Sequence, residues 1–238
     1  MNLSIIIPTL NEAQYISETV CKVRENAILG EPFEIIVIDS GSCDGTRGIA
    51  EELRVRLIDS KTDQLGKSYA LNQASSFASG DVMMFLDADS IVPEGYDWLI
   101  LNSFKNPEVV GGAFEFSLDG REFGLRVVEL INRIRYRVRQ RYYGDQGIFV
   151  RSDAFKSVGG YPEIGLLETA HLCKNLRKEG KLQLIEAYMK TSPRRFLEGG
   201  IYRVLLNDIK IWFMDLIGIN VNKYASAYWK ENKLRSKN

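Results

Sequence analysis

Short apolar segments alternate with amphipathic segments along the first half of the chain. The apolar segments are "LSIIIP" (3–8), "FEIIVID" (33–39), "VRLID" (55–59) and "DVMMFLD" (81–87), and branched hydrophobic residues make up most of them. Nearly continuous apolar runs of this length are typical of strands that are buried on both faces of a parallel sheet. The pattern therefore predicts four parallel strands in this half of the chain.

The segments between these strands have the character of helices. They are "NEAQYISETVCKVREN" (11–26), in which Asn11 is a suitable N-cap, "DGTRGIAEEL" (44–53) and "GKSYALNQASSFA" (66–78). A strand, a helix and a second strand in succession form a βαβ unit with a right-handed crossover. The alternation predicts an α/β fold with a doubly wound, mostly parallel sheet and helices on both of its faces.

The rhythm changes after about residue 109. We expect a strand at 109–118, a long arginine-rich helix at 121–143, a strand at 147–151, and helices at 166–179 and 200–217. The second half extends the first half and does not repeat it. The chain is therefore expected to form one catalytic domain over residues 1–218, followed by a basic C-terminal tail at 219–238.

Composition excludes several classes of protein. The 238 residues are 45% hydrophobic, and 31 basic residues balance 31 acidic residues, so no general attraction to nucleic acid is expected. Cys21, Cys43 and Cys173 are odd in number and far apart, which favours reduced thiols in a cytoplasmic protein. No run of 18 apolar residues and no signal peptide is present, so we expect a chain that is neither secreted nor membrane-spanning.

Acidic residues follow the predicted strands. In an open α/β sheet, ligands bind beyond the carboxyl ends of the strands, and Glu12, Asp39, Asp44, Asp87 and Asp89 all fall there. Asp87 and Asp89 are one residue apart, so a turn can direct both carboxylates at one hard cation. With a single histidine and scattered cysteines, a zinc site is not favoured. The alternative is that the D-x-D sequence is ordinary turn chemistry and that Asp39 caps a loop.

Two other nucleotide-binding motifs fail on inspection. "KTDQLGKS" (61–68) ends like a phosphate-binding P-loop, but Lys61 stands where the first glycine is required. No G-x-G-x-x-G follows the first strand, so a dinucleotide site is not expected. Gly66 and Lys67 can still place a helix N-terminus and a cation near a phosphate group.

Five segments in order, "SIIIPTLNEAQYI", "IIVIDSGSCDGT", "GKSYALNQA", "GDVMMFLDADS" and "VGGYPE", resemble the family 2 glycosyltransferases, which have the GT-A fold. "YGDQGIFVRSDAF" and "TSPRRF" are closest to a bacterial subgroup associated with radical-SAM and selenodomain genes. The resemblance implies an inverting, metal-assisted transfer of a sugar from a nucleotide-diphosphate donor, most readily a UDP-sugar. It implies that the base and ribose are held by Pro8, Thr9, Glu12 and Asp39.

The resemblance also assigns the metal and the diphosphate. Asp87 and Asp89 would be the pair that meets ribose and a Mg²⁺ or Mn²⁺ ion, with Asp89 among the catalytic residues. The subgroup often has histidine in place of Asp87, so the aspartate favours metal use. Arg194 and Arg195 resemble the basic residues that close over the diphosphate, although an exposed basic turn is the alternative.

The acceptor side of the cleft is less well defined. Asp145 and Gln146 resemble residues on the sugar and acceptor side, but they could equally form a turn that enters a strand. In "GLLETAHL" (165–172), Glu168 matches the acid of the family's "ED" pair, whereas Thr169 replaces the aspartate expected to be the base. Glu168 could act instead, His171 could act one helical turn away, or the acceptor could arrive already ionised. We favour Glu168 as the base. The alternative is that Glu168 complements the helix dipole and Thr169 caps the helix.

Two other classes of function stay open. A catalytically silent sugar-nucleotide-binding protein would explain Thr169, and turnover would distinguish it from an enzyme. A nucleotidyltransferase would need a phosphate loop rich in glycine and arginine after the first strand, which "PTLNEAQYI" lacks.

Two helices bear on the acceptor and on partners. Arg133, Arg135, Arg137, Arg139 and Arg141 spread around their helix, so we expect most of them to be solvated, with a contact to anionic lipid or a phosphorylated acceptor as the alternative. For residues 203–217 core packing is favoured over an oligomer or a bilayer-surface contact. A lipid-linked acceptor, a homo-oligomer and peripheral contact with the inner membrane face stay open.

Overall fold

The computed structural model describes residues 1–30, 33–60 and 67–225. Its strands are β1 (Leu3–Thr9), β2 (Phe33–Asp39), β3 (Arg56–Asp59), β4 (Val82–Phe85), β5 (Ser90–Ile91), β6 (Val109–Leu118), β7 (Ile148–Arg151) and β8 (Lys181–Thr191). Its helices are α1 (Ile16–Glu25), α2 (Thr46–Glu52), α3 (Ser68–Ser75), α4 (Tyr96–Ser103), α5 (Phe123–Arg139), α6 (Ser152–Ser157), α7 (Glu168–Leu176), α8 (Arg194–Gly199) and α9 (Ile201–Leu216). Two short 3₁₀ turns, η1 (Gly144–Gln146) and η2 (Val221–Tyr224), complete the described elements.

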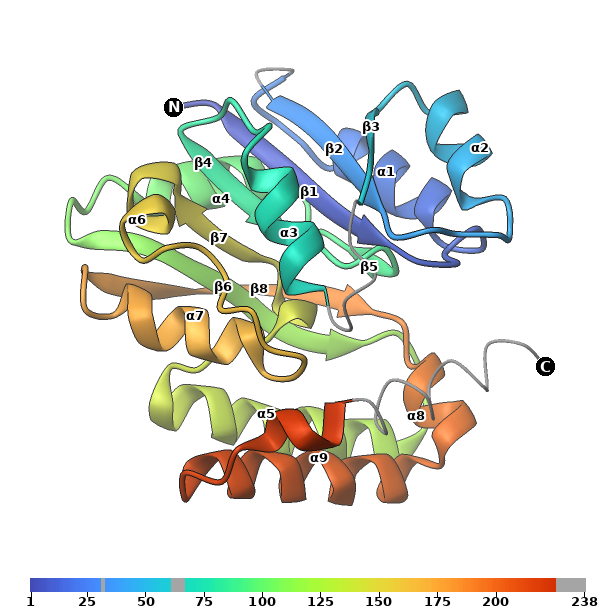
Figure 1. Cartoon of the computed structure of the whole chain (residues 1–238), viewed down its shortest axis with the longest axis vertical. Coiled ribbons are helices and arrows are strands. Elements are labelled where there is room, and N and C mark those ends of the chain that lie inside the picture. Colours follow the sequence, from blue (N-terminus) through green and yellow to red (C-terminus); the bar gives the residue numbers. More distant parts are fainter. Residues whose placement is uncertain (31–32, 61–66, 226–238) are drawn as a thin grey trace.

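The strands form one mixed sheet with the order β3-β2-β1-β4-β7-β6-β8-β5 (Figure 1). The pairs β3–β2, β2–β1, β1–β4 and β6–β8 are parallel, whereas β7 runs antiparallel to β4 and β6, and β5 runs antiparallel to β8. The prediction of a mostly parallel, doubly wound α/β sheet is therefore confirmed. The strand order reverses between β1 and β4, which places a binding crevice at their carboxyl ends.

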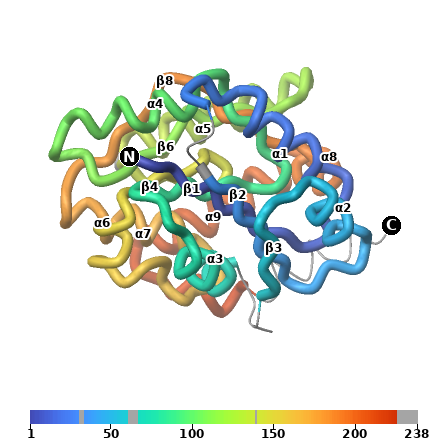
Figure 2. Tube along the Cα trace, turned by 90° about the horizontal axis from the view of Figure 1, so that it is seen from above, coloured from blue at the N-terminus to red at the C-terminus, as the bar shows by residue number. Residues whose placement is uncertain are grey.

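Alternation of side chains along the central strand gives each face of the sheet its own core. In β1, Ile5 and Ile7 pack with Val20 of α1 and Ile100 of α4 on one face. Ile6 points to the other face, where α3, α5, α6 and α7 contribute to the second core. Figure 2 shows α1 and α4 on one side of the sheet and α3, α6 and α7 on the other. Both faces of the central strands are covered, which explains why apolar residues dominate their sequences.

Several boundaries differ from the prediction. Helix α1 begins at Ile16 and not near Asn11, so the expected N-cap at Asn11 is wrong. Asn11 has φ 58°, a left-handed conformation that asparagine tolerates better than most residues. The elements β5, β8, α4, α6 and α8 are not among the predicted ones. Strand β8 has alternating exposed and buried residues, so it lacks the continuous apolar run that marked the central strands.

The packed part of the chain continues past the predicted boundary at residue 218. Val221 and Ala225 are buried with Leu166 and Ile211, and Gly165 donates its N–H to the side-chain oxygen of Asn222 at 3.0 Å. The rest of the predicted tail, 226–238, lies outside the described residues. Among the residues that are described, no helix is both long enough and apolar enough to cross a bilayer.

Candidate active site

Two loops at the carboxyl ends of β1 and β2 are joined to each other by hydrogen bonds. Asn11 donates its N–H to Ser42 Oγ at 2.8 Å, and its side-chain oxygen accepts from the N–H of Cys43 at 2.9 Å. Glu12 donates its N–H to Thr46 Oγ1 at 2.8 Å. These bonds fix the segment that carries Glu12, and this segment forms one wall of the strand-end crevice.

Asp39 is the last residue of β2, and its side chain shapes the loop that follows. The carboxylate is 1% exposed and accepts hydrogen bonds from Thr9 Oγ1 at 3.0 Å, from Gly41 N at 3.0 Å and from Ser42 N at 2.8 Å. Loop capping, the alternative weighed for Asp39, is what these contacts show. Contact of Pro8, Thr9 or Asp39 with a base or ribose stays a prediction.

The D-x-D segment forms a turn in which the two acids take different partners. Ser90 donates its N–H to the carbonyl of Asp87 at 3.1 Å, which closes the turn. Asp87 Oδ1 accepts from Lys67 Nζ at 2.7 Å. Gly144 approaches this pair so closely that a Cβ there would lie 2.5 Å from Lys67 Nζ. Glycine at 144 therefore lets η1 close over the Lys67–Asp87 ion pair.

Arg194 connects Asp89 to the loop after β1. Its Nη2 donates to Glu12 Oε1 at 2.7 Å, and its Nε lies 3.1 Å from Asp89 Oδ2. The guanidinium also lies over the ring of Tyr15, 4.6 Å from the centroid. Residues 182 positions apart in the sequence thus share one ion-pair cluster. The prediction that Arg194 lies at the candidate site is consistent with this geometry.

Glu168 opens α7 after a residue with unusual backbone geometry. Leu167 has φ 61°, a left-handed backbone conformation that is rare for a bulky residue and that strains the backbone. Glu168 is 8% exposed, and burial raises the pKa of its carboxyl while the nearby Lys67 ammonium opposes that shift. Thr169 is 2% exposed. The strained turn thus places a buried carboxyl beside the Lys67–Asp87 pair.

Asp87 lies at the centre of the acidic cluster. Burial is the largest cause of the raised pKa of each of the four other carboxyls, and the negative charge of Asp87 raises each pKa further. These four carboxyls belong to Glu12, Asp89, Asp145 and Glu168. For Asp145 the result is a pKa of about 6. Burial would lower the pKa of the Lys67 ammonium, but Asp87, Glu168 and Asp145 raise it. The crevice therefore holds an excess of carboxylates that a bound cation would relieve.

Three predicted residues have their side chains engaged elsewhere. Arg195 forms a two-pronged ion pair with Asp208 of α9, at 2.9 Å and 2.6 Å. His171 Nε2 lies 2.9 Å from Asp215 Oδ1, on the side of α7 that meets α9. Gln146 is 1% exposed; its Nε2 donates to the carbonyl of Phe114, and its Oε1 accepts from the N–H of Tyr143. The structure therefore brings Glu12, Asp87, Asp89, Asp145, Glu168, Lys67 and Arg194 together. The side chains of Gln146 and His171 turn to other partners, and Arg195 holds Asp208 while its charge still acts on Asp145.

The arginines of the predicted Arg-rich helix also have partners within the fold. Arg133 and Arg137 lie against the buried Glu115, Arg141 forms an ion pair with Asp215 at 2.7 Å, and Arg135 lies over the ring of Tyr143. The side chain of Arg139 lies outside the described residues. The expectation that most of these arginines are simply solvated is therefore wrong.

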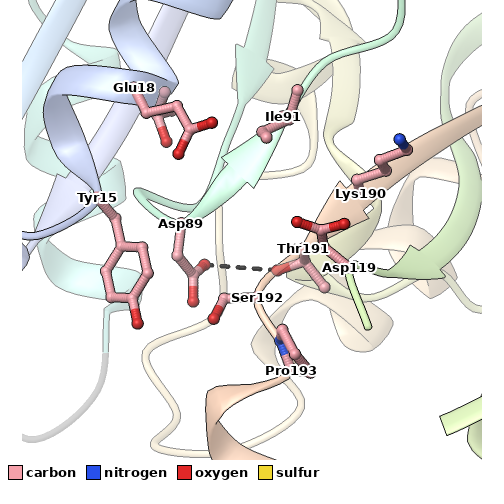
Figure 3. Close-up of a pocket in the computed structure, with 10 residues that line it drawn as sticks. Tyr15, Glu18, Asp89, Ile91, Asp119, Lys190, Thr191, Ser192 and Pro193 are labelled. Carbon is pink, nitrogen blue, oxygen red and sulfur yellow. Dashed lines mark hydrogen bonds between the residues drawn. The ribbon is translucent and has the colours of Figure 1, made fainter. Parts of the chain in front are cut away.

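Asp89 also lines a small pocket beside the cluster (Figure 3). It has a volume of about 90 Å³, and its lining residues include Tyr15, Glu18, Lys190 and Thr191. The Thr191 hydroxyl donates to Asp89 at 3.4 Å. Pockets for drug-sized ligands are roughly 300 Å³ or larger. The pocket is therefore too small for a nucleotide sugar, which would have to lie across the strand ends.

Whether the cluster suits a divalent cation can be tested on its donor atoms. Among the residues that are described, no group of three or more His, Cys, Asp or Glu side chains is placed to hold a metal. Mg²⁺ is commonly held by one or two carboxylates together with substrate phosphates. Asp87 and Asp89 supply hard oxygen donors, and the nearby Glu12 Oε2 is buried without a hydrogen-bond partner in the described part of the chain. The residues fit a cation that a bound diphosphate helps to hold.

Tertiary contacts identify residues that the sequence pattern did not suggest. Tyr15, Asp208 and Asp215 contact Arg194, Arg195 and His171 respectively. Asp208 and Asp215 stand in an apolar helix, and an isolated acid in such a segment is the signal that could have indicated an inward ion pair.

Comparison with known proteins agrees with the geometry. Residues 4–158, more than half of the chain, match the sequence profile of the family described as Glycosyl transferase family 2. Glycosyltransferase AglE of Haloferax volcanii is 27% identical in an alignment of 243 positions that covers 95% of this chain and 79% of AglE.

Two solved structures share the fold. Mannosyltransferase PcManGT from Pyrobaculum calidifontis, in complex with GDP-Man and Mn²⁺, superposes with a TM-score of 0.68 and 20% identity over 95% of this chain and 69% of that chain. S. aureus TarS 1-349 in complex with UDP-GlcNAc superposes with a TM-score of 0.62 and 18% identity over 81% of this chain and 58% of that one. The sequence match to the family profile and the shared architecture lead to one conclusion: the chain belongs to glycosyl transferase family 2.

Proposed function

We propose that this glycosyltransferase moves a sugar from a nucleoside-diphosphate donor to an acceptor in one inverting, metal-assisted displacement. The observation that carries the proposal is the strand-end cluster in which Asp87 is paired with Lys67, and Arg194 is shared by Glu12 and Asp89. Solved relatives of the same fold contain GDP-Man with Mn²⁺ or UDP-GlcNAc, so both kinds of donor are candidates. The resemblance to the radical-SAM-associated subgroup stays a prediction.

Lys67 and Arg194 are the cations that would meet the diphosphate. Both are already held in the crevice by carboxylates, so they need little reorganisation when an anion binds. The guanidinium of Arg194 can form two parallel hydrogen bonds to phosphate oxygens. Asp87 and Asp89 would hold the divalent ion, which when bound supplies Lewis-acid stabilisation of the charge on the leaving diphosphate.

Glu168 is the proposed general base. Its buried carboxyl has a raised pKa, which brings its proton affinity closer to that needed near neutral pH. In the displacement the acceptor oxygen bonds to the anomeric carbon, the bond from that carbon to the donor phosphate breaks, and the acceptor proton passes to Glu168. Thr169 cannot take this proton, and His171 is engaged with Asp215. Asp145, with a pKa of about 6, is the second carboxyl at the acceptor side.

The donor site is tested by calorimetry with UDP- and GDP-sugars, in the presence of Mn²⁺ and of EDTA. We expect metal-dependent binding that Asp89→Ala weakens at least tenfold, about 1.4 kcal/mol. The control is Asp153→Ala, because Asp153 is exposed and pairs with Arg151 on the surface. Equal affinity with and without metal, in wild type and Asp89→Ala alike, would contradict the metal assignment.

The base is tested by transfer kinetics with the donor that the binding screen identifies. Glu168→Gln should keep donor affinity and lose transfer to a hydroxyl acceptor by roughly a hundredfold or more. Wild-type transfer by Glu168→Gln would remove Glu168 from the mechanism. Donor binding with no transfer by the wild-type protein to any acceptor offered would support the silent binding protein instead.

A further inference from the structure

Helices α5 and α9 leave a row of large apolar side chains exposed, although their other faces are packed into the core. Core packing, the favoured interpretation of the α9 sequence, explains Leu205 and Ile211 but not its outer face. Exposure reaches 78% for Phe123 on α5 and 67% for Leu206 on α9. The exposed residues are Phe123, Leu130, Ile134 and Val138 on α5, and Tyr202, Leu206, Phe213 and Ile217 on and just after α9. We refer to these eight residues as the α5–α9 face.

The spacing of these residues makes each set a narrow stripe. With about 100° of rotation per residue, the four residues of α5 fall within an arc of about 80°, and those of α9 within about 60°. The two helices pack against each other where a Cβ on Gly124 would lie 3.0 Å from Ile201. Figure 1 shows them side by side at the end of the molecule that lies beyond β6 and β8. Two neighbouring stripes thus form one apolar surface.

Basic side chains border this surface. Arg126 and Arg137 lie along one edge of the α5 stripe, and their side chains stay 45% and 51% exposed while each also pairs with a carboxylate. Arg203 and Lys210 are exposed beside the α9 stripe. An apolar stripe with a basic border is the pattern of a helix that lies in a bilayer interface.

The acidic residues of both helices turn away from the surface. Glu129 is 8% exposed and accepts from the N–H of Leu118. Asp208 holds Arg195, and Asp215 holds Arg141 and His171. The exposed side of the two helices therefore carries cations and no carboxylate; Glu122, an exposed acid, stands just before α5. This charge distribution is complementary to anionic lipid.

We infer that the α5–α9 face docks on an anionic lipid bilayer. A second copy of the chain fits less well, because a two-fold interface would place the basic borders of the two copies against each other without acids to compensate them. The inference concerns a different surface from the strand-end crevice, so it does not depend on the proposed transfer activity. Helix α9 holds Arg195, the neighbour of Arg194, and His171, which lies three residues after Glu168, so docking would bring the crevice close to the membrane surface.

Vesicle co-sedimentation of the full chain tests this inference. We expect at least tenfold greater partitioning into vesicles of phosphatidylcholine mixed with phosphatidylglycerol than into phosphatidylcholine alone, and a decrease as salt increases. Leu206→Glu and, as a second variant, Phe213→Ser should each lower partitioning at least fivefold. Trp98→Glu is the matched control, because Trp98 is an exposed aromatic residue on α4, outside the α5–α9 face. Circular dichroism melting verifies that each variant stays folded.

Three outcomes would overturn the inference. The first is no partitioning of the wild-type chain into anionic vesicles. The second is an equal loss in Trp98→Glu, which would show that the effect is not specific to this face. The third is a dimer, measured by light scattering without lipid, that Leu206→Glu dissociates; the face would then be an interface between copies of the chain.

Discussion

Replacing Asp145 by asparagine should stabilise the protein, by an amount that increases with pH. Burial, followed by the charge of Asp87, raises the pKa of Asp145 from 3.8 to about 6. A carboxyl with a raised pKa opposes folding once it is ionised. Below the lower pKa the group is protonated in both the folded and the unfolded state, so it contributes no penalty. Above the higher pKa it is ionised in both states, and the full penalty applies.

The magnitude follows from the two pKa values. A shift from 3.8 to about 6 corresponds to about 3 kcal/mol of lost stability when the carboxyl is fully ionised. Linkage gives a penalty of about 0.6 kcal/mol at about pH 4, about 1.6 at about pH 5 and about 3 at about pH 7. The favourable effects of Arg135, Arg195 and Lys67 on the carboxylate are already contained in the shift.

Urea unfolding between about pH 5 and pH 8, with EDTA and without nucleotide, measures the effect. The free energy of unfolding of Asp145→Asn should exceed that of the wild type, and the difference should grow by about 1 kcal/mol or more over this range. Asp119→Asn is the control, because Asp119 is exposed and its replacement should change stability by less than about 0.5 kcal/mol. A difference that does not vary with pH, or an Asp145→Asn variant less stable than wild type near neutral pH, would refute the reasoning.

Two further predictions concern the sheet and its helix support. A Cβ at Gly112 would overlap the backbone carbonyl of Gln183 on β8, so Gly112→Ala should lower the free energy of unfolding by about 3 kcal/mol or more. A Cβ at Gly48 in α2 would meet no atom within 4 Å, so Gly48→Ala should raise the free energy of unfolding by about 0.5–1 kcal/mol. Thermal unfolding of both variants measures this, and a Gly112→Ala variant as stable as wild type would contradict the β6–β8 pairing. Glu115 is 3% exposed and accepts hydrogen bonds from Tyr136 and Arg137. In urea unfolding, Glu115→Gln should therefore lower the free energy of unfolding by about 1–3 kcal/mol, whereas the control Glu186→Gln, at an exposed glutamate, should leave it unchanged. Equal stability of both glutamine variants would show that the Glu115 network contributes little.

The sequence alone determined the class of the fold and the edge of the sheet where the candidate site lies. Strands such as β1 and β2 must be largely apolar on both faces because helices cover both, and that requirement is readable as the runs of branched residues at 5–7 and 35–38. The acids that follow these strands then fall at one edge, because the carboxyl ends of parallel strands coincide. The motifs around Glu12, Asp87 and Glu168 needed no contact information to be noticed. Strand β8 was not predicted, although its alternation of exposed and buried positions is the pattern of a half-buried strand.

Only the tertiary structure decided which partner each charged side chain takes. Arg194 and Arg195 are adjacent in sequence and open helix α8, where consecutive side chains point about 100° apart. As a result Arg194 reaches Glu12 and Asp89, whereas Arg195 reaches Asp208 on α9. His171 lies three residues after Glu168, about 60° around α7 from it, and meets Asp215 of α9. Hydrophobic periodicity determines which face of an element is buried, but the partner of a buried charge depends on how distant elements pack against that face.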